Sequence, residues 1–280
     1  MDARQVASHY SRSALLARLN GALREDGIDP GRPSIEALAL YDQFHGRGLE
    51  ATEEVARLMP ARAGDHLLDV GSGIGGPARW FARRFDCRVT GIDLTAEFCE
   101  VARHLTQLLG MQDRVRFELG NALEMPFTAA SFDGAYSMNV SMNIADKAAL
   151  YREIRRTLKP GGWLVLSEIA KVPGGAELGY PTPWAASART SFLSTPEETR
   201  RGLAEAGFEV LRIDDTRAAT LEFGARARAM VERGEKPPHR AVWLIHGELA
   251  QEAAANTARG LKEGAIVPIE VLARSREIGV

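Results

Sequence analysis

The stretch that most constrains how this chain can fold runs from residue 66 to residue 82. A short, mostly apolar run over 66–70 is followed by a glycine-rich turn over 71–76 and a helical pattern over 77–82. This order of strand, tight turn and helix is where α/β proteins usually hold a nucleotide-like ligand, because glycines let the backbone approach it closely. Asp69 at the strand end would repel a pyrophosphate. The stretch therefore predicts a ligand that carries hydroxyls or a cationic amino-acid group.

A second acid follows at a position that suits the same ligand. Residues 88–93 have the pattern of the next strand, and this strand also ends in an acid, Asp93. An acid at the end of the second strand normally accepts hydrogen bonds from ribose hydroxyls. The alternative is that Asp69 and Asp93 only cap the helices that follow them. Both acids together with the glycine turn favour the ligand site.

Strand and helix patterns alternate from residue 66 onward. This alternation is typical of an α/β fold with a doubly wound, mostly parallel, seven-stranded sheet of the Rossmann-like type. We expect strands at 66–70, 88–93, 115–119, 132–138, 163–170, 208–214 and 266–273. We expect helices between them, for example at 96–109, 147–158 and 196–206, the last with a capping box at Thr195.

Helical segments flank and interrupt this alternating core. We divide the chain into an N-terminal helical lid (1–60), a cofactor-binding α/β core (61–215), a helical lid insertion (216–262) and the final strand of the core (263–280). We expect the two lid segments to pack together over the strand ends.

Composition and charge exclude several classes of partner. The 280 residues carry a formal net charge of −2, which lacks the basic field that nucleic-acid binding needs. No apolar run is long enough to span a membrane and no signal peptide is evident, so we expect a cytoplasmic protein. Cys87 and Cys99 are expected to be buried, reduced thiols, and no spacing predicts a metal site. Whether the chain forms a homodimer is left open.

Several motifs together resemble one known family. The chain from about residue 41 to 215 is similar to the class I S-adenosylmethionine-dependent methyltransferases. The motifs that carry the resemblance are residues 69–79, 91–94, 120–127, 131–137 and 158–162. Residues 75–79 resemble the sterol and tocopherol C-methyltransferase branch, and residues 46–52 resemble phosphoethanolamine and related small-amine N-methyltransferases. The resemblance implies a transferase that moves a methyl group from S-adenosylmethionine to a small molecule and releases S-adenosylhomocysteine. The acceptor atom, nitrogen, oxygen or carbon, stays undecided.

The resemblance also implies a set of cofactor-binding residues. They are Gly48, Asp69, Gly71, Ser72, Gly73, Asp93, Leu94, Asn121, Ala122 and Asn139. In the family pattern the turn lies under the methionine tail, Asp93 meets the ribose and Asn139 faces the methionine amino group. Many relatives carry Asp where Asn121 stands, so a charge-assisted bond to the adenine amino group is lost here. Asn121 is equally well explained as a turn residue.

Residues that follow the later strands, and one upstream cluster, are candidates for the chemistry. Tyr41, His45 and Glu168 are the candidate catalytic residues, because an aromatic ring stabilises a cation and His or Glu can take a proton. The candidate substrate-binding residues are Phe44, Ser141, Met142, Asn143 and Trp184. For each residue, core packing, helix capping or solvent exposure is the alternative interpretation.

Two other functions remain open from the sequence. Residues 71–76 also satisfy the dinucleotide fingerprint, which would make the chain an NAD(P)-dependent oxidoreductase. Asp69 and the turn at 158–162 count against it, because a pyrophosphate site disfavours a carboxylate and the turn has no role in that scheme. A non-catalytic regulatory protein that binds S-adenosylmethionine would keep the cofactor motifs without a substrate pocket.

Overall fold

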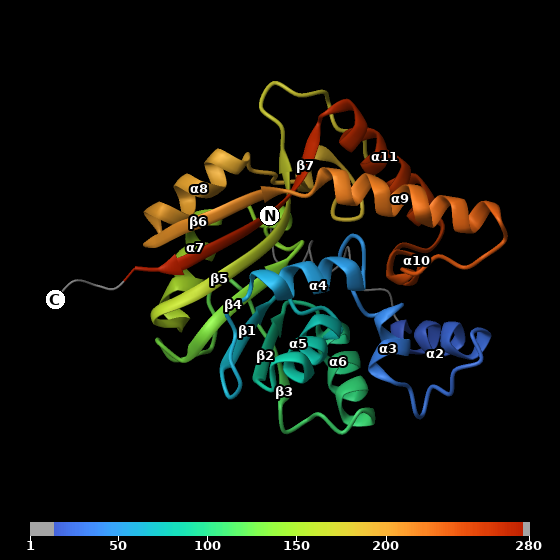
Figure 1. Ribbon diagram of the computed structural model, residues 1–280, viewed down its shortest axis with the longest axis horizontal. Coiled ribbons are helices and arrows are strands. Elements are labelled where there is room, and N and C mark those ends of the chain that lie inside the picture. The colour runs from blue at the N-terminus through green and yellow to red at the C-terminus, as the bar shows by residue number, and fades with distance from the viewer. Residues whose placement is uncertain (1–13, 277–280) are drawn as a thin grey trace.

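A seven-stranded sheet forms the centre of the molecule. The computed structural model describes residues 14–276 (Figure 1). The strands are β1 (His66–Val70), β2 (Arg88–Asp93), β3 (Val115–Leu119), β4 (Phe132–Met138), β5 (Leu158–Lys171), β6 (Phe208–Asp215) and β7 (Ile266–Ser275). They are ordered β3-β2-β1-β4-β5-β7-β6, and only β7 is antiparallel to its neighbours. The predicted doubly wound, mostly parallel sheet is confirmed.

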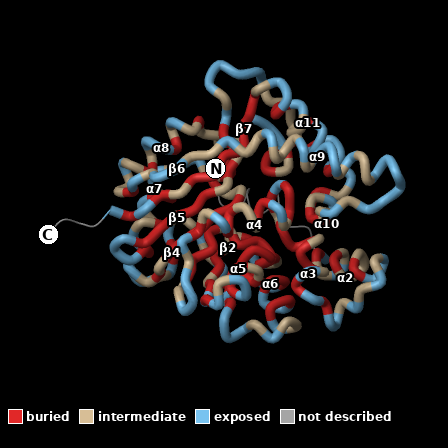
Figure 2. The backbone as a smooth tube through the Cα atoms, in the orientation of Figure 1, coloured by how far each residue is buried: buried red, intermediate tan, exposed pale blue. Residues whose placement is uncertain are grey.

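Helices cover both faces of this sheet. They are α2 (Leu15–Glu25), α3 (Ile35–Ala39), α4 (Leu49–Leu58), α5 (Gly76–Phe85), α6 (Ala96–Leu108), α7 (Lys147–Thr157), α8 (Pro196–Glu205), α9 (Arg217–Glu232), α10 (Ala241–His246) and α11 (Ala250–Glu263). Leu67 packs with α4 and α5, whereas its neighbour Leu68 packs with α7 and α8. Successive strand residues point to opposite faces, so an apolar strand such as β1 is buried on both sides (Figure 2).

Two local predictions can be checked at element ends. The capping box at the start of α8 is confirmed, since Thr195 accepts from the backbone of Glu198 and the Glu198 side chain accepts in return. The strand predicted at 163–170 begins earlier, at Leu158. Its register against β4 shifts between Phe132 and Gly134, so the expected turn at 158–162 is an irregular start of β5.

The N-terminal helices lie beside the helices of the late insertion (Figure 1). Arg18 Nε donates to the Leu244 carbonyl at 3.1 Å. The backbone N–H of Arg240 donates to the Leu40 carbonyl at 2.8 Å. Asp26, after α2, also binds both Lys236 and Arg240. The expected boundaries of the lids stay a prediction, and residues 1–13 and 277–280 lie outside the described part.

Two further features concern the cysteines and membranes. Cys87 and Cys99 are both buried and free of disulfides. Among residues 14–276, no helix combines the length and apolar character that crossing a membrane requires.

Candidate cofactor site

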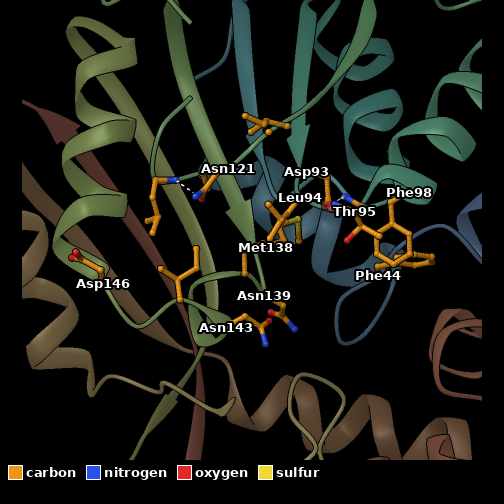
Figure 3. A pocket seen from close by; sticks show the side chains of 18 of the residues that line it. Phe44, Asp93, Leu94, Thr95, Phe98, Asn121, Met138, Asn139, Asn143 and Asp146 are labelled. Carbon is orange, nitrogen blue, oxygen red and sulfur yellow. Dashed lines mark hydrogen bonds between the residues drawn. The ribbon is translucent and has the colours of Figure 1, made fainter. Parts of the chain in front are cut away.

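A cavity of about 310 Å³ lies at the carboxyl ends of β1, β2 and β4 (Figure 3). This edge is where open α/β sheets bind ligands. Of the residues selected from the sequence, the cavity is lined by Phe44, Gly71, Gly73, Asp93, Leu94, Asn121, Ala122, Asn139 and Asn143. Segments separated by up to about a hundred residues along the chain therefore meet around one space.

The glycine turn is shaped by backbone that other residues would strain. Gly71 and Gly73 have φ angles of 79° and 53°, in the left-handed region. A Cβ added at Gly71 would lie 2.3 Å from Cγ2 of Val140, and one at Gly73 would lie 3.3 Å from Phe44. A side chain at Gly71 would clash and one at Gly73 would crowd Phe44, so these two positions present bare backbone to the cavity.

Asp93 joins the end of β2 to this turn. Its Oδ2 accepts from the Gly73 N–H at 2.8 Å, and its Oδ1 accepts from the Thr95 N–H at 2.9 Å. Burial raises the pKa of Asp93, while the bonds from Thr95 and Gly73 act in the opposite direction. The N-cap of α6 is Thr95, so the interpretation of Asp93 as only a helix cap is wrong.

Asp69 and Ser72 hold polar atoms that lack a partner. Asp69 is 3% exposed, and burial raises its pKa to about 8. Within residues 14–276 neither Asp69 Oδ2 nor Ser72 Oγ has a hydrogen-bond partner. The N-cap of α5 is Gly75, so Asp69 does not cap that helix either. The Tyr136 hydroxyl interacts with Asp69 and lowers its pKa, opposing the effect of burial. Ser72 Oγ is therefore the buried atom of this pair for which a ligand would supply a missing bond.

The sequence suggested two roles for Asn121, a turn residue and a cofactor contact, and its position is consistent with both. Its Oδ1 accepts from the Leu123 N–H at 3.0 Å, which is a turn of the kind Asn favours. Asn121 and Ala122 also line the cavity (Figure 3). One lone pair of this amide oxygen is therefore used within the chain, and the other is available for a donor.

The loop after β4 supplies two amides to the cavity. Asn139 has a φ of 57°, which is uncommon for a residue with a side chain, and its N–H donates to Ser167 O at 2.7 Å. Asn139 and Asn143 lie close together beyond the strand ends (Figure 3). Asn143 Nδ2 donates to Trp184 O at 2.6 Å, so it also holds the segment after β5.

Lys147, a half-buried lysine that sequence reasoning missed, stabilises this loop. Lys147 Nζ donates to the carbonyls of Ser141 and Ile144, at 2.5 and 2.6 Å, and to that of Phe192. Glu168 is buried, and its Oε1 accepts from the Ser141 N–H at 3.1 Å. Burial lowers the pKa of Lys147 to about 8 and raises the pKa of Glu168 to about 7. Nothing in the sequence marks Lys147, because its partners come from separate loops.

Several predicted residues lie away from the cavity lining. The Tyr41 hydroxyl, whose pKa burial raises to about 12, binds Asp26 and the Ala22 carbonyl. Met142 and Trp184 are buried in an apolar cluster, and Ser141 contributes backbone contacts. The structure thus places Tyr41 between α2 and the late insertion rather than in a wall of this cavity.

His45 and Gly48 form a second group outside the cavity lining. His45 is buried, and burial lowers its pKa to about 4. A Cβ at Gly48 would lie 2.8 Å from Nδ1 of His239, so the ring from the late insertion packs on this glycine. In the described part of the chain there is no cluster of three or more metal-ligating side chains.

The fold and the cavity define a Rossmann-like α/β protein with a site for a nucleoside-bearing cofactor. Residues 68–166 match the methyltransferase domain family. The chain is 32% identical over 190 residues to 27-O-demethylrifamycin SV methyltransferase from Amycolatopsis mediterranei, covering 64% of this chain and 70% of the relative. It therefore belongs to the S-adenosylmethionine-dependent methyltransferase family. A sterol C-methyltransferase and a phosphoethanolamine N-methyltransferase are also among its relatives, of which the chain spans 49% and 42%.

Two solved structures show the same fold. Geranyl diphosphate C-methyltransferase from Streptomyces coelicolor A3(2) superposes with a TM-score of 0.70 at 21% identity, over 97% of both chains. The [4+2]-cyclase SpnF has a TM-score of 0.63 at 26% identity, over 81% of this chain and 80% of that one. The methyltransferase relatives give the nicotinamide alternative no support.

Proposed function

We propose that this protein transfers a methyl group from S-adenosylmethionine to a small-molecule acceptor. The observation that carries the proposal is the cavity lined by Gly71 and Gly73 of the glycine turn and by Asp93, whose carboxylate accepts from the Gly73 N–H. Bare backbone and a carboxylate at a strand end suit a ligand with both a ribose and an amino-acid tail.

The residues present fit this cofactor part by part. Asp93 would accept from the ribose hydroxyls, and Leu94 would pack on the adenine. Asn121 and Ala122 would meet the adenine edge. The tail would lie along the glycine turn, near Ser72, Asp69 and Asn139. The cofactor supplies a methyl group already activated by the sulfonium, so the chain has to align the nucleophile and exclude water.

The acceptor is proposed as a small molecule on the evidence of relatives and architecture. The relatives' names cite a rifamycin, a sterol and phosphoethanolamine, all of them small molecules.

We propose that residues 1–60 and 216–262 act as lids over the carboxyl ends of the core strands, with residues 263–280 completing the core that begins at residue 61. Phe44, Asn143 and Glu168 are the proposed acceptor-side residues. A cytoplasmic location and a homodimer stay predictions.

A second candidate is a protein that binds the cofactor without transferring its methyl group. It is favoured by one observation, the likeness to the [4+2]-cyclase SpnF. Both candidates predict cofactor binding, so only methyl transfer separates them.

The test is transfer of label from radiolabelled S-adenosylmethionine into a small-molecule extract, with the Asp69→Ala, Asp93→Ala double variant as the blank. Label in one discrete compound would support the enzyme and identify its acceptor. Binding of S-adenosylhomocysteine by the wild type, with no transfer into extracts from several sources, would favour the second candidate.

A further inference from the structure

A single lysine side chain joins two loops of the molecule. Lys147 is the first residue of α7, and its Nζ donates to the carbonyls of Ser141 and Ile144 at 2.5 and 2.6 Å. The third bond runs to the carbonyl of Phe192, also at 2.6 Å. An ammonium group has three N–H donors, so these three carbonyls use all of them. Because the donor is charged, each of these bonds is stronger than one between neutral groups.

The first of the two loops forms part of the cavity wall. We call residues 139–146 the cavity loop, and the members that line the cavity are Asn139, Val140, Asn143, Ile144, Ala145 and Asp146 (Figure 3). The regular structure in this loop is one short 3-10 turn over Ser141–Asn143. The shape of the loop therefore depends on bonds from outside it. Lys147 supplies two of them, and Glu168 accepts from the Ser141 N–H.

The second loop lies outside the cavity. We call residues 184–192, between β5 and α8, the outer segment, and none of them is among the described residues that line the cavity. The Phe192 N–H donates to the Met142 carbonyl at 2.8 Å, and Asn143 Nδ2 donates to the Trp184 carbonyl at 2.6 Å. These two bonds and the one from Lys147 tie the outer segment to the cavity loop, and the bond from Lys147 is the charged one.

Few ionisable groups surround Lys147. Burial lowers its pKa to about 8, although the charge of the buried Glu168 on β5 acts in the opposite direction. On α7, burial and then the charge of Glu168 raise the pKa of Tyr151. Asp146 and Arg189, the charged residues of the cavity loop and of the outer segment, are both exposed. Once Lys147 loses a proton, its neutral amine can donate to only two of the three carbonyls.

We propose that Lys147 is a positioning residue that transmits cofactor binding from the cavity loop to the outer segment. This inference rests on the proposed function through its cofactor and is independent of the acceptor. A ligand in the cavity stabilises the loop conformation in which the Ser141 and Ile144 carbonyls face Nζ. The same ammonium then holds the Phe192 carbonyl, so the outer segment becomes ordered without touching the ligand. The coupling is reciprocal, so order in the outer segment also strengthens cofactor binding.

Hydrogen exchange of the full chain, with and without S-adenosylhomocysteine, tests the transmission. In the wild type, we expect the ligand to slow amide exchange in both the cavity loop and the outer segment. In Lys147→Met, the ligand should still protect the cavity loop but no longer the outer segment. Arg156→Met is the matched control, because Arg156 on the same helix donates to the carbonyls of Met125 and Phe127, outside the cavity lining. Equal protection of the outer segment in Lys147→Met and the wild type would overturn the proposal.

Calorimetry of S-adenosylhomocysteine binding across a range of pH gives a second readout. Lys147→Met should bind about 10-fold more weakly than the wild type at neutral pH. The wild-type affinity should fall toward that of the variant as the pH rises past about 8, whereas the variant should lack this decline. Any titration of the ligand's own amino group appears in both proteins. Glu168→Gln removes a charge that favours the ammonium form, so it should shift the decline to lower pH.

The outcomes separate this inference from the proposed function. Parallel pH profiles in the wild type and Lys147→Met would overturn the role of Lys147, as would a ligand that leaves exchange in the wild-type outer segment unchanged. Neither result would affect the proposed methyl transfer. A wild type that does not bind S-adenosylhomocysteine at all would instead contradict the proposed cofactor site, and the role of Lys147 would fail with it.

Discussion

The cofactor side and the lid side of this molecule are built in different ways. On the cofactor side, the turn at 71–76 and Asp93 belong to two neighbouring strand ends, and each is made by a short local motif. On the lid side, Asp26 holds Lys236 and Arg240, more than two hundred residues away in sequence. The comparison teaches that the ligand platform is specified locally, whereas the cover depends on contacts that form only in the complete fold.

The largest expected effect comes from breaking the ion pair that ties these two sides together. Arg79→Met would leave the buried Asp42 carboxylate without its partner, and we expect a loss of about 3–5 kcal/mol in unfolding free energy. Urea unfolding measures this loss. The double variant Arg79→Met, Asp42→Asn should recover much of it, because the uncompensated charge is gone. Equal losses in the single and double variants would contradict a dominant role for the charge.

The cofactor side is tested most directly at Asp93. Asp93→Ala removes the acceptor of the Gly73 N–H together with the proposed ribose contacts, so S-adenosylhomocysteine should bind about 10- to 100-fold more weakly. Isothermal titration calorimetry measures the affinity. Asp113→Ala, at an exposed position, is the control. Unchanged binding in Asp93→Ala would show that the ribose lies elsewhere.

The lid side is tested at Asp26. Asp26→Asn should weaken the hold on Lys236 and Arg240 by about 1 kcal/mol, and the segment 216–262 should become more sensitive to limited proteolysis. The pKa of Asp26 is lowered from 3.8 to about 2 by hydrogen bonds from Lys236, Tyr41 and Arg240, which together outweigh the opposing effect of burial. Its ionised form therefore stabilises the fold above about pH 4, and this contribution disappears as the pH falls toward 2.

The free energy of unfolding of the wild type and of Asp26→Asn, measured across this pH range, tests whether the ionised form of Asp26 stabilises the fold. The stability difference should be full near neutral pH and shrink below about pH 4. A difference that grew on acidification would mean that Asp26 is not held as a carboxylate.

The smallest expected effect is on cofactor affinity and comes from Asn121. Asn121→Asp keeps the turn to the Leu123 N–H and adds charge to the proposed contact with the adenine amino group. We expect S-adenosylmethionine to bind a few-fold more tightly, measured by the same calorimetry. Weaker binding would place the adenine amino group away from this side chain.

Local patterns were sufficient for most of the core. The strands at 66–70, 88–93, 115–119 and 132–138 were predicted with the observed bounds, because each is a short segment containing apolar residues that is bounded by turns. The early start of β5 was missed, since the irregular pairing of residues 158–162 depends on where β4 lies. The antiparallel direction of β7 likewise follows from how the late insertion returns the chain to the sheet.

The amino-acid sequence by itself determined the alternation of strands and helices, the glycine turn and the acids at two strand ends, because these features depend on near neighbours. The tertiary structure decided which side chains share a space. It brought Tyr41 into contact with Asp26, bonded Lys147 to the loop after β4 and placed His45 beside Thr52. Such roles arise from hydrogen bonds between distant segments, and only the assembled fold brings these segments within bonding distance.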